Sequence, residues 1–122
     1  MSRNHRPELN AILLQLVAEL HAYASLVQGL ADEWQARQDV VMFGEPGQAM
    51  DRMRSLAAAI PPLSVQWVMV MISHTELMHN LWRMTRGEPL DVAAEVGDHL
   101  ACVEALAVKC RLLLSQGGHV LH

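Results

Sequence analysis

Apolar residues recur along the first third of the chain in alternating steps of three and four positions. This spacing corresponds to a period of 3.5 residues, which is typical of a helix that packs along a coiled-coil seam. With Pro7 at the expected first turn, the pattern predicts one long helix over about residues 7–42. The seam consists of Leu13, Leu16, Leu20, Tyr23, Val27, Leu30 and Trp34.

Gly29 is the weak point of this long helix. A glycine in a helix interior costs about 1 kcal/mol relative to alanine. The sequence therefore leaves two interpretations open: a continuous helix, which we favour, and two helices broken near Gly29.

The same tripeptide marks two expected turns, Gly44-Glu45-Pro46 and Gly87-Glu88-Pro89. Glycine can adopt the left-handed conformation that ends a helix, and proline favours the first turn of the next one. A third break is expected at Pro61-Pro62, followed by Ser64 as an N-cap. These signals predict further helices at about 48–59, 64–86 and 90–116, the last of them ended by Gly117-Gly118.

No stretch of useful length alternates β-branched and polar residues, so strands are not expected. The sequence predicts an all-α fold in one domain over residues 1–122, with flexible ends at 1–6 and 117–122. We expect an up-down helical bundle of three long helices and one short helix.

The expected helix lengths do not match. At 1.5 Å per residue the first helix would be roughly 50 Å long, whereas its two long partners would reach about 34 and 39 Å. Either the short helix 48–59 or a second copy of the chain must cover the excess. We favour a homodimer that shares the first helix through its seam.

Composition supports contact with a partner. Of the 122 residues, 52% are hydrophobic and only 18% are charged, which is a low share for a surface that must face water alone. The net charge of -4 leaves no basic stripe, so we expect no nucleic acid ligand.

The sequence indicates a cytoplasmic protein without a membrane span. No apolar signal segment is visible after Met1, and Pro61-Pro62 divides the least charged stretch, Ser55 to Thr75, into pieces too short to cross a bilayer. Cys102 and Cys110 lie eight positions apart on one expected helix, about 12 Å, which is too far for a disulfide. Free cysteines fit a reducing compartment.

Glu76 and His79 have the i,i+3 spacing that di-metal helical bundles use. Glu95 and His99, on the next helix, could complete a mixed metal site. One such pair is weak evidence, because Glu76 and His79 also fall on the polar face of an amphipathic helix. We favour that solvated face and expect no metal and no cofactor.

A stripe of Trp67, Met71, His74, Met78 and Leu81 could in principle ligate haem or copper. At helical spacing, methionine and tryptophan are more often core residues. His74 is therefore expected to be a satisfied or partly exposed core histidine.

Methionine-rich helix surfaces adapt to varied partner helices, and the expected partner-binding residues are Met50, Met53, Met69 and Met71. No nucleophile motif or phosphate-binding loop is present, so we expect no enzyme. The favoured function is a small interaction protein, such as an adaptor, a chaperone-like protein or a regulatory module, that acts through an apolar helical surface on a partner helix. The alternatives are a metal- or cofactor-binding bundle that uses Glu76 and His79, and a small-molecule sensor with a Met- and Trp-lined pocket.

Overall fold

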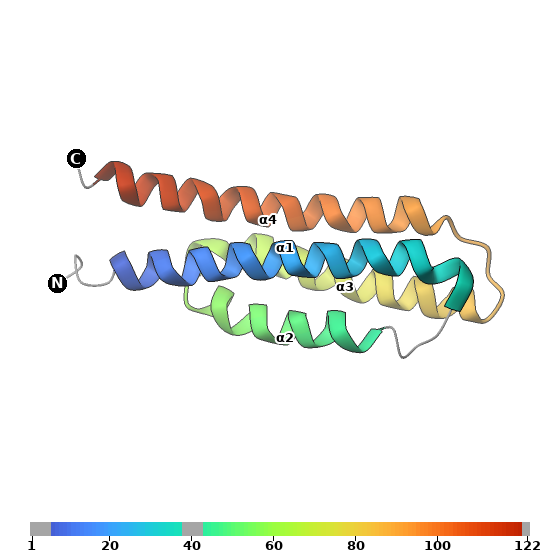
Figure 1. Ribbon diagram of the computed structural model, residues 1–122. Coiled ribbons are helices and arrows are strands. Elements are labelled where there is room, and N and C mark those ends of the chain that lie inside the picture. Colours follow the sequence, from blue (N-terminus) through green and yellow to red (C-terminus); the bar gives the residue numbers. More distant parts are fainter. Residues whose placement is uncertain (1–5, 38–42, 121–122) are drawn as a thin grey trace.

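The computed structural model describes residues 6–37 and 43–120, and these form four α-helices and one short 3-10 helix. The elements are α1 (Arg6–Arg37), α2 (Gly44–Ala58), η3 (Pro61–Leu63), α3 (Ser64–Thr85) and α4 (Val92–Val120). Figure 1 shows the helices lying side by side, with the start of α1 and the end of α4 at the same end of the molecule. The described residues contain no strand, and the all-α prediction is confirmed.

Helix α1 runs without a break through Gly29, so the interpretation with two helices is wrong. It packs mainly against α4 and α2, while α3 packs mainly against α4. With 32 residues in α1 and 29 in α4, the two helices are about 48 and 44 Å long. The expected overhang is therefore nearly absent, because α4 is longer than predicted and covers α1.

The two Gly-Glu-Pro segments differ in structure. Gly87 has a φ of 92°, as expected for a helix-ending glycine, and the Asp91 side chain then accepts a hydrogen bond from the Ala94 N–H at 3.1 Å to cap α4. Gly44 instead is the first residue of α2, with Pro46 in the first turn. The prediction of a left-handed cap at Gly44 is wrong, because the helix begins four residues earlier than expected.

Other boundaries follow the sequence closely. Pro61-Pro62 forms the predicted corner as η3, and α3 ends one residue before the expected position. The N-cap position of α3 is Leu63, which makes no capping side-chain hydrogen bond, so the prediction of Ser64 as the N-cap is wrong by one residue. Helix α4 continues through Gly117-Gly118 to Val120, beyond the expected end at 116, since glycine weakens a helix without stopping it. The predicted helical residues 38–42 lie outside the described residues, as do 1–5 and 121–122.

The core lies between all four helices and contains Leu16 and Leu20 from α1, Met53 from α2, Leu77 and Leu81 from α3, and Leu106 from α4. Pro7–Trp34 in α1 is long and apolar enough to cross a membrane. Core helices of soluble proteins also meet this criterion of length and composition. In this fold the seam side of α1 is buried against the other helices.

Candidate functional site

Three helices meet at a cluster of polar side chains in the middle of the bundle. Tyr23 of α1 places its hydroxyl oxygen 2.7 Å from Nδ1 of His74 and 2.5 Å from Nε2 of His99. The Oγ of Ser73 lies 2.6 Å from Nδ1 of His99. We call Tyr23, Ser73, His74 and His99 the buried polar cluster. It forms one hydrogen-bonded chain, in the order Ser73, His99, Tyr23, His74.

Burial keeps this cluster uncharged. It lowers the pKa of His99 to about 4, with a smaller contribution from the nearby charge of His74, and it lowers the pKa of His74 as well. Burial also raises the pKa of the Tyr23 hydroxyl above its ordinary value. Since the charged form of each group is disfavoured, the cluster is held together by neutral hydrogen bonds.

Ser73, His99 and Tyr23 follow one another in the order of a catalytic triad, with a hydroxyl, an imidazole and a third group that contacts the imidazole. Their chemical properties differ from those of a triad. A general base works best with a pKa near the working pH, and His99 is a much weaker base than that. The third member is a neutral phenol rather than a carboxylate, so it would not stabilise an imidazolium. Ser73 also lies inside α3, where the backbone N–H groups are used by the helix. The geometry favours a structural or binding role for the cluster.

The expected dimer seam is part of the core of a single chain. All seven of its side chains are at most 3% exposed, because α4 and α2 cover this side of α1. The predicted seam is the buried side of α1, but the helices that pack against it belong to the same chain. In this fold the seam therefore offers no free surface to a second copy. The seven residues are Leu13, Leu16, Leu20, Tyr23, Val27, Leu30 and Trp34.

The four predicted partner-binding methionines do not share a surface. Met50 and Met53 of α2 are buried in the core, at 5% and 0% exposure, so neither belongs to an outer surface on which a partner helix could dock. Met71 is half-buried and lines a pocket between α2 and α3. Met69 alone is well exposed, at 54%.

The mixed metal site is not assembled. Glu95 accepts a hydrogen bond from the Asn80 amide at 3.0 Å, and His99 points into the buried polar cluster. His79 stacks on Trp82, with ring centroids 5.9 Å apart, and Glu76 lines a hollow between α3 and α4. Over residues 6–37 and 43–120, no three His, Cys, Asp or Glu side chains are grouped as they would be to hold a metal ion.

An exposed apolar surface lies on the outside of α3 and α4. Val65, Met69 and Ile72 of α3 are 66%, 54% and 53% exposed, so helix α2 does not cover them. The hollow beside them, of about 300 Å³, reaches Asp98 and Cys102 of α4. We call Val65, Met69, Ile72, Cys102 and Ala105 the outer α3–α4 face.

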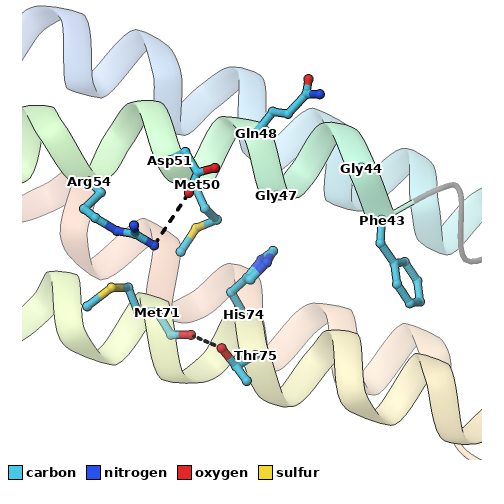
Figure 2. Close-up of a pocket in the computed structure, with 10 residues that line it drawn as sticks. All are labelled: Phe43, Gly44, Gly47, Gln48, Met50, Asp51, Arg54, Met71, His74 and Thr75. Atoms are coloured by element: carbon cyan, nitrogen blue, oxygen red, sulfur yellow. Dashed lines mark hydrogen bonds and ion pairs between the residues drawn. The ribbon is translucent and has the colours of Figure 1, made fainter.

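A second pocket lies between the first half of α2 and the middle of α3, and it has a volume of about 480 Å³ (Figure 2). His74 projects from α3 towards α2 in this view, and Met50 and Met71 lie on either side of the gap. Phe43 lines the end of the pocket and is stacked on Trp34, with ring centroids 5.9 Å apart. The pocket thus meets the buried polar cluster at His74.

Sequence reasoning missed the cluster, although it singled out three of its members for other reasons. Tyr23 was assigned to the seam, His74 to the methionine stripe and His99 to the metal site. The available signal was that each lies at an inward-facing position of a different helix, among apolar neighbours. His74 is partly exposed and hydrogen-bonded, as expected of a core histidine.

Comparisons with known proteins add no relative: the chain matches no protein family model, and it has no detectable match among curated proteins or solved structures.

Proposed function

We propose that this up-down bundle is a non-enzymatic interaction protein that acts as a homodimer through the outer α3–α4 face. The observation that carries the proposal is the exposure of Val65, Met69 and Ile72 on successive turns of one helix. A contiguous exposed apolar patch on a small soluble protein is typical of an interface. The low overall charge of the chain, 18%, points the same way.

The two helices present matching stripes. On α3, Val65, Met69, Ile72 and Glu76 follow one another at steps of four, three and four positions, and such residues share one side of a helix. On α4, Asp98, Cys102, Ala105 and Lys109 repeat the same steps. The α3 stripe is apolar from Val65 to Ile72 and ends in Glu76, whereas the α4 stripe has an apolar middle and a charged residue at each end.

The direction of the helices sets how these charges are arranged. Ser73 contacts His99, and Asn80 contacts Glu95, so α3 and α4 are antiparallel. Glu76 and Asp98 line the same hollow. Lys109 follows Asp98 by eleven positions, about three helical turns, and so lies towards the opposite end of the face, on the side of Val65.

This arrangement is self-complementary under a twofold axis. A twofold interface brings the same patch of both copies together. If the axis runs across the helices, one end of each patch meets the other end of its partner. The acidic end of one copy, Glu76 and Asp98, would then face Lys109 of the second copy across an apolar centre. Opposite charges at the rim of an interface favour the correct alignment. A second copy is therefore the partner that this face fits best.

The proposal is tested by Ile72→Asp, which places a charge at the centre of the face. We expect the dimer dissociation constant to rise by about 30-fold or more, as at an interface hot spot, with helicity unchanged. The measurement is sedimentation equilibrium together with circular dichroism. The matched control is Leu14→Asp on α1, since Leu14 is also exposed, at 60%, and lies outside the face. Equal effects of the two variants on self-association would contradict the proposal.

A charge exchange tests the alignment. Lys109→Glu should weaken the dimer by placing like charges together, and the added change Glu76→Lys in the same chain should restore it. A double variant as weak as the single one would contradict the pairing of Glu76 with Lys109 across the interface.

A further inference from the structure

The pocket between α2 and α3 has the features of a binding site that the interaction surface does not use. Its volume of about 480 Å³ lies within the range of small-molecule sites. It opens on a different side of α3 from the outer α3–α4 face, since Met71 and Thr75 line it whereas Met69, Ile72 and Glu76 line the hollow on the α4 side.

Helix α2 leaves the space open because its near side carries glycine. Gly44 and Gly47 both line the pocket, and a Cβ atom at either would meet no atom within 4 Å. Helix α2 also packs more closely on α1 than on α3. The space between α2 and α3 is therefore not filled by side chains of the bundle.

The apolar part of the pocket lining suits a ring. Phe43 closes one end and is held there by stacking on Trp34. Met50 and Met71 bring two thioethers to the pocket (Figure 2). Thioether sulfur makes favourable contacts with aromatic rings and adapts to irregular shapes.

The charges at the rim cancel. Asp51 and Arg54 both line the pocket from α2, and their charged atoms are 3.6 Å apart. No other Asp, Glu, Lys or Arg lines the pocket among the described residues. The lining therefore has no net charge with which to select an ion.

Among the polar side chains of the lining, which also include Gln48 and Thr75, His74 is the one that joins the pocket to the buried polar cluster. Its Nδ1 is 2.7 Å from the Tyr23 hydroxyl, which leaves Nε2 as the ring nitrogen available to a ligand. The Tyr23 hydroxyl carries a single proton and contacts two imidazoles, so it donates to one and accepts from the other. If Tyr23 donates to His74, then Nε2 of His74 carries a proton and donates to the pocket. If His74 donates to Tyr23 instead, then Nε2 is an acceptor.

The hydrogen-bond direction at Tyr23 also fixes the directions at His99 and Ser73, on the α4 side of the bundle. When Tyr23 donates to His74, His99 must donate from Nε2 to Tyr23 and accept at Nδ1 from Ser73. In the opposite case His99 donates from Nδ1 to Ser73. Ser73 lines the hollow on the α4 side, so the direction of this hydrogen-bonded chain links the two sides.

We propose that the α2–α3 pocket binds an uncharged aromatic molecule that carries one hydroxyl or carbonyl oxygen, and that this oxygen bonds to Nε2 of His74. The apolar walls hold the ring, and the ligand oxygen selects the tautomer of His74. Through Tyr23 this choice also selects the tautomer of His99, so a ligand on one side of the bundle sets the hydrogen bond at Ser73 on the other. The site does not depend on dimerisation.

The test uses p-cresol as the probe and the full chain as the protein, with binding followed by NMR titration. Toluene lacks the hydroxyl, so we expect it to bind about tenfold more weakly, the value of one net hydrogen bond. Benzoate is charged and should also bind more weakly than p-cresol, because the lining offers no net charge to balance it. Gly47→Leu should fill the pocket and reduce p-cresol affinity at least about tenfold. Gly29→Ala on α1, where a Cβ also meets no atom within 4 Å, should leave affinity unchanged.

The imidazole nitrogen shifts give a second readout. On binding of p-cresol, the Nδ1 and Nε2 signals of His74 and His99 should change together in the wild type. In Tyr23→Phe the His99 signals should no longer respond to the ligand, whereas His74 still should. The proposal is overturned if p-cresol does not bind at millimolar concentration, if Gly47→Leu binds it as well as the wild type does, or if toluene and p-cresol bind equally. Loss of the dimer in Ile72→Asp should not alter p-cresol affinity. The binding-site proposal and the dimer proposal can therefore be refuted independently of each other.

Discussion

The Tyr23 hydroxyl lies 2.5 Å from Nε2 of His99, at a point where α1 and α4 face each other in the core. The same oxygen is 2.7 Å from His74 of α3, so one phenol oxygen joins three helices. Buried polar groups are costly unless they are hydrogen-bonded. A sliding or rotation of any of these helices would break the cluster, which therefore favours one packing arrangement over others of similar apolar burial.

Tyr23→Phe should destabilise the protein by about 1–3 kcal/mol, because it leaves ring nitrogens of His74 and His99 buried without their partner. Urea denaturation followed by circular dichroism measures the change. The control is Thr75→Val, which removes an exposed hydroxyl bonded to the Met71 carbonyl and should stay within about 0.5 kcal/mol of the wild type. A Tyr23→Phe protein as stable as this control would show that the cluster contributes no net stability.

Stability should fall as the pH drops from 6.5 to 4. Burial lowers the pKa of His99 from 6.5 to about 4, so in this window the unfolded chain binds a proton that the folded chain does not. The free energy of unfolding is therefore fully present above pH 6.5 and declines towards pH 4, by about 3 kcal/mol for His99. The lowered pKa of His74 acts in the same direction.

This pH dependence is measured by denaturation at a series of pH values, together with NMR titration of the histidine rings. His21→Gln, which removes an exposed imidazole on α1, should leave the decline in place. A His99 ring that titrates near 6.5 in the folded protein would contradict the account of the cluster as a desolvated, neutral group.

Two glycine substitutions should have opposite effects. Gly29→Ala should stabilise the protein by about 0.5–1 kcal/mol, because Gly29 lies inside continuous α1 and a Cβ there meets no atom within 4 Å. Gly87→Ala should destabilise it by about 1 kcal/mol or more, because Gly87 has a φ of 92°. Thermal denaturation of both variants measures the difference, and a loss of stability in Gly29→Ala would indicate a break in α1.

The two methionines that the sequence grouped together should respond differently to truncation. Met53→Ala removes a fully buried side chain and should cost about 2–5 kcal/mol. Met69→Ala removes an exposed one and should change the stability of the monomer by less than about 0.5 kcal/mol, while weakening self-association. Denaturation at low protein concentration separates these effects. A Met69→Ala variant as unstable as Met53→Ala would place Met69 in the core.

The sequence predicted where the helices lie in the chain better than it predicted which helices pack against one another. The three-four spacing from Leu13 to Trp34 identified the buried side of α1, because that period follows from helix geometry. It did not indicate which helix covers that side, since a second copy and α4 would produce the same pattern. Met53 was misassigned for a related reason: a methionine spacing does not tell the core side of α2 from an exposed side.

The cluster depended on information that a single sequence lacks. Tyr23, His74 and His99 lie on three helices, and their contact depends on how each helix is rotated and shifted along the bundle. Each residue was visible as a polar group among apolar neighbours, but the pairing was not. Gly44 was misread for a local reason, because a Gly-Glu-Pro segment can either end one helix or begin the next.

The most direct test of the central proposal is the solution mass of the wild-type chain, measured by light scattering over a range of concentrations. We expect a species of about twice 13.6 kDa that dissociates on dilution, with Ile72→Asp dissociating at concentrations about 30-fold higher or more. A wild-type protein of 13.6 kDa at all concentrations would contradict the proposal that the outer α3–α4 face joins two copies.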